Sequence, residues 1–407
     1  MLSEDAIQNL IQPILDRQTS INTYVLQTIA KRIKEIGALS ASDVQKLEVM
    51  LKTGADVRKI NETLAKMTNL QVRDIKKLIQ TIAEDAYVDA KPYYDYKQLP
   101  FIPFAKNEEL QRVVTSIGKR TAEEYVNLSR SSTVGLMIRD RKNPTKLKFK
   151  SISKVYTDVV DEAIQATQQG TIDYNTAIRN TMRQLVASGV RRVVYESGRT
   201  QRLDTAVRRN ILEGVRAINQ GVQDEIGKQF GADGKELSVH INSAPDHEPI
   251  QGRQFKNAEV EKMQSNKPFK DVNGKQYPAM ERAIGMWNCR HYMWSIIVGV
   301  TKPNYSEKEL QKMAERNAEG YTMPNGKKMS LYECEQYQRK LEAKVRTAKD
   351  GQIMALEQGD MDEARRYQAL VNKYTKDYKL FSEACGLSPK SNRMTVSGYK
   401  RISIKNR

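Results

Sequence analysis

The sequence predicts a mainly α-helical protein with a small α+β domain and a C-terminal antiparallel helical hairpin. Apolar residues recur at three- and four-residue steps over residues 1–230 and again over residues 330–386, as expected of amphipathic helices. Between these regions, Asn273-Gly274 and Asn325-Gly326 are typical of tight β-turns. The chain has 407 residues, which is too long for one ordinary hydrophobic core and indicates two or three domains.

Residues 1–90 are expected to form an N-terminal helical region. A periodic apolar face extends from Ile21 to Ile36, and Gly37 is suited to end that helix. Ser42 followed by Gln45 has the pattern of a capping box, which would open the next helix.

The segment 91–104 interrupts the helical pattern. Its sequence, KPYYDYKQLPFIPF, includes three prolines and five aromatic residues, and such a composition is not expected in regular helix. We expect either a linker or an extended arm laid on a neighbouring molecule, or an ordered connection tucked against the helices of the same chain.

Residues 105–230 are expected to return to helix and to carry a basic strip. Periodic apolar positions recur over residues 155–164 and 174–185. Six arginines then follow within about five helical turns' length, namely Arg191, Arg192, Arg199, Arg202, Arg208 and Arg209. Such a strip can contact nucleic-acid phosphates. A solvated helix face paired with Glu196 and Asp204 is the alternative.

The overall charge favours a polyanionic partner. The chain carries 67 lysines and arginines against 49 aspartates and glutamates, a formal net charge of +18, and basic groups release counterions from phosphate backbones. Three widely spaced cysteines argue against a secreted disulfide scaffold and favour a reducing compartment. The start of the chain lacks the pattern of a signal peptide, and the longest apolar run, near residues 295–300, is too short to span a bilayer.

Residues 231–330 are expected to form the small α+β domain. Asp233-Gly234 is a turn signal that precedes a short alternating strand. Ser306 with Glu309 has the capping-box pattern of a short helix within the domain.

Residues 331–390 are expected to form the helical hairpin. Ser330-x-x-Glu333 is another capping-box pattern, and Gly359-Asp360 marks the turn between the two helices. Cys334 and Cys385 fall on the apolar seam and are expected to be buried packing residues that lie near each other. Residues 391–407 follow as a polar, basic tail that is expected to be mobile.

The stretch GMWNCRHYMW, residues 285–294, collects both tryptophans of the chain with one cysteine and one histidine. The soft or borderline metal ligands of this region are His240, His247, Cys289 and His291, and zinc takes four such ligands in a structural site. Their spacing does not match the paired knuckles of common zinc sites. Zinc binding is therefore one interpretation among several.

Two other interpretations of this stretch stay open. Cys289 could act as a nucleophile with a histidine base, oriented by Asp246, Glu248 or Asn288. Alternatively, these polar side chains hydrogen-bond backbone groups in a packed turn network, and Trp287 and Trp294 cover the core. The sequence contains neither of the two common glycine-rich phosphate-binding patterns.

Four short motifs in this region resemble the phage minor capsid protein 2 family. These are minor head proteins of tailed phages and prophages, related in role to the MuF-type head morphogenesis proteins. The motifs are Ser238 with His240, Pro245 with His247, Gln251-Gly252, and Asn288-Cys289-Arg290-His291. The resemblance covers residues 190–400 well and the N-terminal helices more loosely.

Two positions depart from the family pattern. Ala244 stands where the family usually has an arginine, and Ile250 stands where it usually has a tryptophan. The resemblance still implies the shared fold, but a reaction that needs that arginine is not expected here.

The resemblance implies a virion protein that is present in small numbers in the head, near the portal vertex or the inner capsid. During assembly such a protein would be in the host cytoplasm. Its expected partners are the portal protein, the major capsid or scaffold protein, and packaged double-stranded DNA contacted without sequence specificity. The alternative is an enzyme carried in the head, in which residues 231–330 form a metal-dependent hydrolase, nuclease or nucleotide-modifying domain. No cofactor is expected apart from the zinc of that interpretation.

Overall fold

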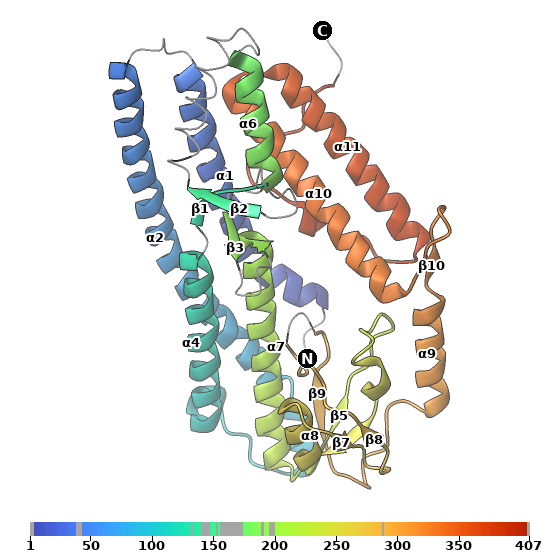
Figure 1. Cartoon of the computed structure of the whole chain (residues 1–407). Coiled ribbons are helices and arrows are strands. Elements are labelled where there is room, and N and C mark those ends of the chain that lie inside the picture. Colours follow the sequence, from blue (N-terminus) through green and yellow to red (C-terminus); the bar gives the residue numbers. More distant parts are fainter. Residues whose placement is uncertain are drawn as a thin grey trace.

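A computed structural model describes residues 4–37, 43–131, 133–139, 147–151, 154, 174–188, 191–194, 200–286 and 289–404. Figure 1 shows long helices along one side of the molecule, a helical hairpin on the other side, and a small α+β domain below the hairpin. The prediction of a mainly α-helical protein with a small α+β region is confirmed. Within the described ranges, no helix is both long enough and apolar enough to cross a membrane.

The N-terminal half is built from long helices joined by short elements. In chain order these are α1 (Glu4–Gly37), α2 (Asp43–Val88), α3 (Lys91–Lys97), the 3-10 turn η1 (Phe104–Lys106), α4 (Glu108–Ser131), β1 (Thr133–Arg139), β2 (Leu147–Ser151), α6 (Tyr174–Ser188), β3 (Arg191–Val194), β4 (Thr200–Arg202) and α7 (Leu203–Gln229). Helix α1 ends at Gly37, as predicted. The expected capping residue Ser42 lies outside the described residues.

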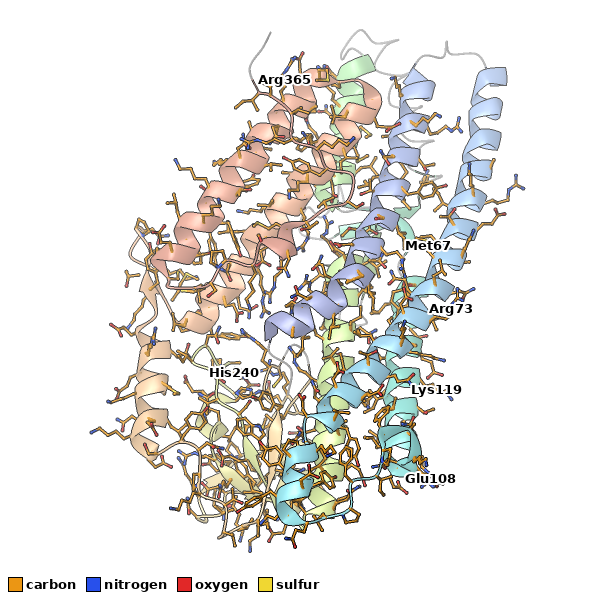
Figure 2. All side chains as sticks on the ribbon, turned by 180° about the vertical axis from the view of Figure 1, so that it is seen from behind. Met67, Arg73, Glu108, Lys119, His240 and Arg365 are labelled. Atoms are coloured by element: carbon orange, nitrogen blue, oxygen red, sulfur yellow. The ribbon has the colours of Figure 1, made fainter. Side chains whose placement is uncertain are left out.

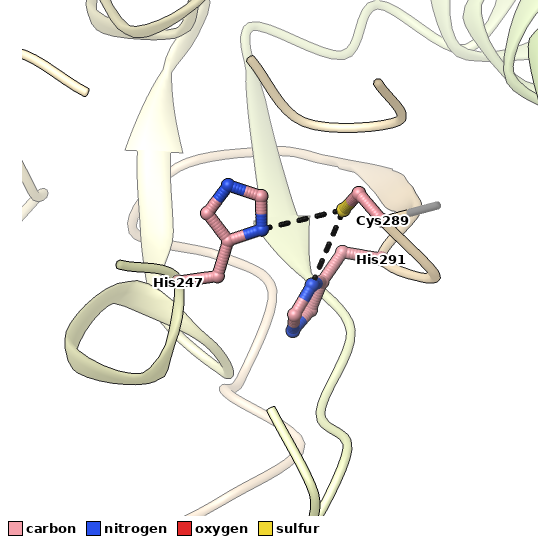
Figure 3. A group of neighbouring side chains, drawn as sticks. All are labelled: His247, Cys289 and His291. Carbon is pink, nitrogen blue, oxygen red and sulfur yellow. Dashed lines mark hydrogen bonds between the residues drawn. The ribbon is translucent and has the colours of Figure 1, made fainter. Parts of the chain in front are cut away.

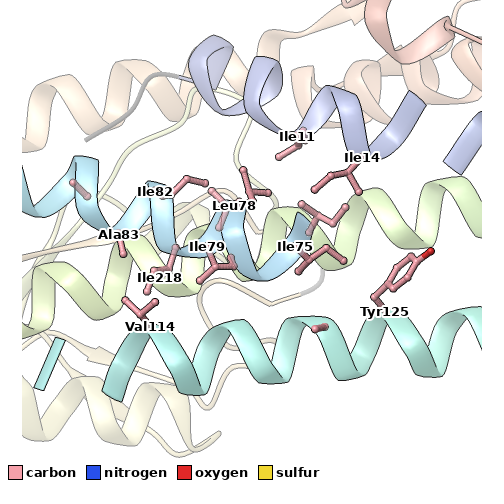
Figure 4. Packing of buried hydrophobic residues seen from close by; sticks show 14 of the residues in the cluster. Ile11, Ile14, Ile75, Leu78, Ile79, Ile82, Ala83, Val114, Tyr125 and Ile218 are labelled. Atoms are coloured by element: carbon pink, nitrogen blue, oxygen red, sulfur yellow. The ribbon is translucent and has the colours of Figure 1, made fainter. Parts of the chain in front are cut away.

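Four of these helices share one hydrophobic core. Figure 4 shows Ile11 and Ile14 of α1 facing Ile75 and Ile79 of α2, with α4 and α7 packed on the other side of α2. These four isoleucines are all at most 4% exposed. Burying an isoleucine side chain stabilises the fold by about 1.5–3 kcal/mol, so the three- and four-residue apolar periodicity accounts for the assembly of the four helices.

The segment 91–104 is an ordered connection, and its first half is helical. The prediction that it contains no regular helix is wrong for α3, because Pro92 lies in the first turn, where its missing N–H breaks no intrahelical hydrogen bond. Gln98 then ends the helix in a left-handed conformation. Tyr94 is buried against Phe230 in a T-shaped contact, and its hydroxyl donates to Gln229 Oε1 at 2.7 Å.

A small antiparallel sheet interrupts the region that was expected to be entirely helical. Its strand order is β2-β1-β3-β4. The sequence of β1, TVGLMIR, is a short apolar run, and periodicity alone does not distinguish such a run from a helical segment. The predicted helix over residues 174–185 is confirmed as α6, whereas the one over residues 155–164 lies outside the described residues.

The α+β domain is built around a three-stranded antiparallel sheet of order β6-β5-β9. Its elements are β5 (Gly234–Leu237), the turn η2 (Glu248–Ile250), β6 (Gln254–Lys256), α8 (Asn257–Gln264), β7 (Phe269–Lys270), β8 (Gln276–Tyr277) and β9 (Met293–Ile296), followed by α9 (Glu307–Glu319), β10 (Tyr321–Thr322) and β11 (Lys328–Met329). Gly274 and Gly326 have positive φ angles of 86° and 81° in the two predicted hairpin turns. The turn expected at Asp233-Gly234 is wrong, because Gly234 already pairs within β5.

The C-terminal hairpin consists of α10 (Leu331–Gln358) and α11 (Met361–Ala384). Both predicted capping boxes, at Ser306 and Ser330, are confirmed. Cys334 and Cys385 lie in one buried cluster, which confirms their predicted place on the seam.

The C-terminal tail packs back on the hairpin. After the turn η3 (Ser391–Met394), Lys349 Nζ donates to the Met394 carbonyl at 2.8 Å and Gln352 Nε2 to the Lys400 carbonyl at 3.1 Å. Thr23 of α1 donates to the Ser397 carbonyl at 2.7 Å. The prediction of a mobile tail is therefore wrong for residues 391–404.

Candidate metal centre

Three of the four predicted metal ligands converge in the α+β domain. His247 comes from the turn that leads into η2, and Cys289 and His291 come from the segment that leads into β9 (Figure 3). The Sγ atom of Cys289 lies 3.3 Å from His247 Nδ1 and 3.4 Å from His291 Nδ1. All three side chains are buried, and their candidate ligand atoms lie within 4.8 Å of one another.

Both imidazoles present an unprotonated nitrogen to the sulfur. The Nε2 atom of His247 lies 2.9 Å from the Arg282 carbonyl, and that of His291 lies 3.3 Å from Gln251 Oε1. Oε1 of Gln251 also accepts from the backbone N–H of His240 at 2.9 Å, which identifies this atom as the acceptor. Each Nε2 therefore carries the proton, and each Nδ1 directs its lone pair at Sγ.

This arrangement fits a metal ion. A single S–H proton can satisfy only one of the two Nδ1 lone pairs, whereas a cation bound to a thiolate would satisfy both. Zinc bonds of about 2.3 Å to sulfur and about 2.0–2.1 Å to nitrogen place these atoms about 3.5 Å apart in a tetrahedral site, close to the observed 3.3 and 3.4 Å. Metal-bound imidazoles usually donate their other N–H to an oxygen acceptor, as His247 does to the Arg282 carbonyl and His291 to Gln251 Oε1.

The fourth predicted ligand, His240, does not join this group. Its Nε2 atom lies 3.1 Å from the Arg290 carbonyl and 3.4 Å from Ser238 Oγ. The His240 ring instead contacts the His291 ring edge-on at 4.9 Å. Three protein ligands plus one further position is the pattern of zinc sites that keep a place for water or substrate.

Burial keeps all three groups neutral when no metal is bound. It raises the pKa of the Cys289 thiol and lowers the pKa of His247. Burial, followed by the neighbouring His240 and His247, lowers the pKa of His291 to about 2. A thiolate–imidazolium pair, which a nucleophilic cysteine requires, is therefore disfavoured here.

The proposed orienting residues also have other partners. Asp246 forms an ion pair with Arg282 at 2.7 Å, although its second oxygen lies 3.5 Å from His247 Nε2. Glu248 accepts from Asn317 Nδ2 at 2.7 Å. Asn288 and Trp287 lie outside the described residues.

The remaining motif residues hold the turns of the domain together. Ser238 pairs with Tyr292 through a backbone hydrogen bond of 2.9 Å and accepts the Tyr292 N–H on Oγ at 3.2 Å. Gly252 has a φ of 70°, and a Cβ atom there would lie 2.5 Å from Leu310. Pro245 is exposed in the turn that precedes His247. These contacts agree with a packed turn network around the three converging ligands.

Arg290 connects this network to the helical hairpin. It forms an ion pair with Glu335 of α10, and Asn242 Nδ2 donates to the same carboxylate at 3.1 Å. Glu335 could not be predicted as a partner of Arg290, because it lies on a helix 45 residues further along the chain. Nor could the sequence reveal the Arg282 carbonyl, since a backbone acceptor leaves no residue-type signature.

The six arginines of the predicted basic strip do not form one helix face. Arg191 and Arg192 belong to β3, and Arg199 lies outside the described residues. Arg202 is 15% exposed and forms ion pairs with Asp204 and Asp350. Arg208 and Arg209 of α7 are half-buried and donate to Gln8 and Gln201. The expectation of a single helical strip is therefore wrong, because a strand pair and a helix start divide it.

The comparisons with known proteins identify the family. No curated protein and no solved structure gives a significant match to the chain. The sequence model of the family described as phage minor capsid protein 2 matches residues 2–381 of the 407 residues. Because this match spans nearly the whole chain, the protein belongs to the phage minor capsid protein 2 family.

Proposed function

We propose that this phage head protein is a structural and interaction protein of the portal vertex or inner capsid, where it acts in head morphogenesis and contacts packaged DNA without sequence specificity. The family match carries the head assignment. The helical framework supports an interaction role, because long amphipathic helices present extended surfaces to the portal, the major capsid protein or a scaffold protein.

The surface of α2 and α4 offers a basic region for the DNA contact. Arg73, Lys76 and Lys77 of α2 and Lys119 and Arg120 of α4 are all exposed. The two helices adjoin here, since Gly118 of α4 backs onto Lys76 of α2. Figure 2 shows Arg73 and Lys119 on the outer side of these helices. This exposed region, rather than the half-buried arginines of α7, is the proposed phosphate contact.

DNA binding by the purified chain tests this proposal. We expect weak binding to duplexes of unrelated sequence, with an affinity that falls steeply as salt is raised, because each neutralised phosphate adds about −0.9 to the slope of log K against log salt. A variant that combines Lys76→Gln and Lys77→Gln should reduce that slope by up to about 2. Lys308→Gln combined with Lys312→Gln, both exposed on α9 on the opposite side of the molecule (Figure 1), is the matched control and should leave the slope unchanged. A flat salt dependence would contradict the DNA contact.

A second candidate function rests on the converging metal ligands. The domain at residues 231–330 would hold zinc through His247, Cys289 and His291 and act as a head-packaged hydrolase, nuclease or nucleotide-modifying enzyme. Zinc would supply a Lewis acid and an activated water at its open position. The arrangement of two neutral imidazoles around one cysteine sulfur is the observation that favours this candidate.

Metal analysis of the purified protein tests the second candidate. We expect about one equivalent of zinc per chain, lost in His247→Ala and retained in His240→Ala, because His247 directs a ring nitrogen at Cys289 Sγ whereas His240 contacts the Arg290 carbonyl. The ligand assignment would be contradicted if both variants retained zinc. It would also be contradicted if the parent protein contained no zinc. Zinc without any hydrolytic or nucleotide-modifying activity would leave the ion with a structural role and favour the first candidate.

A further inference from the structure

A half-open cavity of about 890 Å³ lies where α1, α7, α10, the 391–404 segment and the α+β domain meet. Its lining includes eight arginines and one lysine against three carboxylates. Figure 2 shows His240, one of the lining residues, between the end of α1 and the α+β domain. The packing of segments that are distant in the sequence thus creates the cavity.

The lining keeps an excess of positive charge after nearby carboxylates are included. Nine basic side chains against three acidic ones leave six positive charges. Glu213, Glu335 and Asp350 do not line the cavity but form ion pairs with lining arginines, and three positive charges still remain. Confining like charges in a partly buried space is unfavourable unless an anion neutralises them.

Arg208 shows the effect of this excess most clearly. Its Nη1 atom donates to the neutral Gln8 Oε1 at 2.7 Å, and no ion pair joins it to a carboxylate among the described residues. Burial, followed by the neighbouring Arg393 and Arg346, lowers the pKa of the Arg208 guanidinium to about 10. Arg346 pairs with Asp204 at 3.3 Å and Arg393 lies 4.0 Å from Glu342, so Arg208 is the member of this group of three guanidiniums that faces like charges without an ion pair of its own among the described residues.

We propose that this cavity binds a small phosphorylated molecule of about the size of a nucleoside triphosphate. The planar guanidinium fork matches phosphate oxygens in a bidentate manner, and a volume of about 890 Å³ lies within the usual range of small-molecule sites. Leu15, Leu212 and Val215 give the cavity an apolar side that suits the non-phosphate part of the ligand. Duplex DNA is too wide to enter, so this site differs from the surface contact proposed above.

Calorimetric titration of the full chain tests the proposal, with inorganic tripolyphosphate and adenosine triphosphate as probes at physiological salt. We expect saturable binding of both, with the nucleotide binding more tightly through the apolar side. Arg208→Gln should weaken the binding of both by about tenfold or more, because it removes a charged hydrogen-bond donor from the site. Arg112→Gln on the exposed face of α4 is the matched control and should bind like the parent protein.

Thermal unfolding separates loss of the site from loss of the fold. Arg208→Gln should keep the parent melting temperature without ligand and lose the upward shift that tripolyphosphate gives the parent. Failure of the parent protein to bind either probe would overturn the proposal, as would equal binding by Arg208→Gln. Tricarboxylate binding as tight as that of tripolyphosphate would overturn the assignment to phosphate. Displacement of the nucleotide by short single-stranded DNA at equal phosphate concentration would overturn the assignment to a small ligand.

Discussion

Arg202 lies at the centre of a largely buried ion-pair cluster, and the cost of replacing it can be worked out from the contacts of that cluster. Its Nη1 atom lies 2.9 Å from Asp350 and its Nε atom lies 3.2 Å from Asp204. Arg346 also pairs with Asp204, at 3.3 Å. The change Arg202→Gln removes the positive charge that faces both carboxylates.

The expected cost of Arg202→Gln is about 3 kcal/mol of unfolding free energy. Removing one partner of a buried ion pair costs about 3–5 kcal/mol, because the remaining charge stays buried without compensation. The lower end of this range applies here, since Arg346 still neutralises Asp204. Asp350, with a side chain that is 7% exposed, becomes the uncompensated group.

Urea denaturation followed by far-ultraviolet circular dichroism measures this cost. Arg112→Gln is the control, since Arg112 is 68% exposed and pairs with Glu109 on the surface of α4, and it should change the free energy by less than about 0.5 kcal/mol. Adding Asp350→Asn to Arg202→Gln should recover part of the loss. A cost below about 1 kcal/mol for Arg202→Gln, or no recovery in the double variant, would refute the reasoning.

The same cluster predicts a pH dependence. Burial raises the pKa of Asp350 even with Arg202 beside it, and without Arg202 the pKa should rise further. A carboxyl group with a folded pKa above its unfolded pKa binds protons more tightly in the native state, so lowering the pH towards the folded value stabilises the fold. The deficit of Arg202→Gln relative to the parent should therefore shrink between pH 7 and pH 5. A deficit that grows over this interval would contradict the assignment.

Three further predictions concern the helical hairpin. Gly351→Ala should lower the free energy of unfolding by about 1–3 kcal/mol, because the added Cβ would lie 2.3 Å from the Tyr367 ring between α10 and α11. Urea denaturation measures this loss, and an unchanged free energy would contradict the close packing. Cys334 and Cys385 should not react with a thiol reagent at pH 8 until the protein unfolds. Burial raises the pKa of both thiols, that of Cys385 to about 12. Rapid reaction of either cysteine in the native protein would refute this prediction. Arg183→Gln should lower the free energy of unfolding by about 1 kcal/mol. Arg183 is 42% exposed, but two of its nitrogens donate to Glu363 and so connect α6 to α11. An unchanged melting temperature would show that this ion pair does not stabilise the contact between the two helices.

Helical periodicity and capping patterns predict most of the fold, because they are local properties of the chain. The capping boxes at Ser306 and Ser330 and the seam cysteines all lie where spacing predicts them. The β1–β4 sheet is missed because short apolar strands carry no distinctive period. The helix α3 is missed because prolines can occupy a first helical turn.

The candidate metal centre is predictable in residue type but not in geometry. Spacing leaves His240, His247, Cys289 and His291 equivalent, and only the fold shows that three converge and that His240 turns away. The arginines of the basic strip demonstrate the same limit. The side chain of Arg202, for example, has a buried partner, Asp350, that lies on a helix almost 150 residues away.

Quantitative mass spectrometry of purified, DNA-filled phage heads tests the central claim most directly. If the chain is a minor structural protein of the head, it should be retained in washed heads at a small, constant ratio to the major capsid protein, and cross-linking should join it to the portal or to the inner capsid surface. Absence from filled heads, or a copy number that varies between preparations of equal purity, would contradict the account.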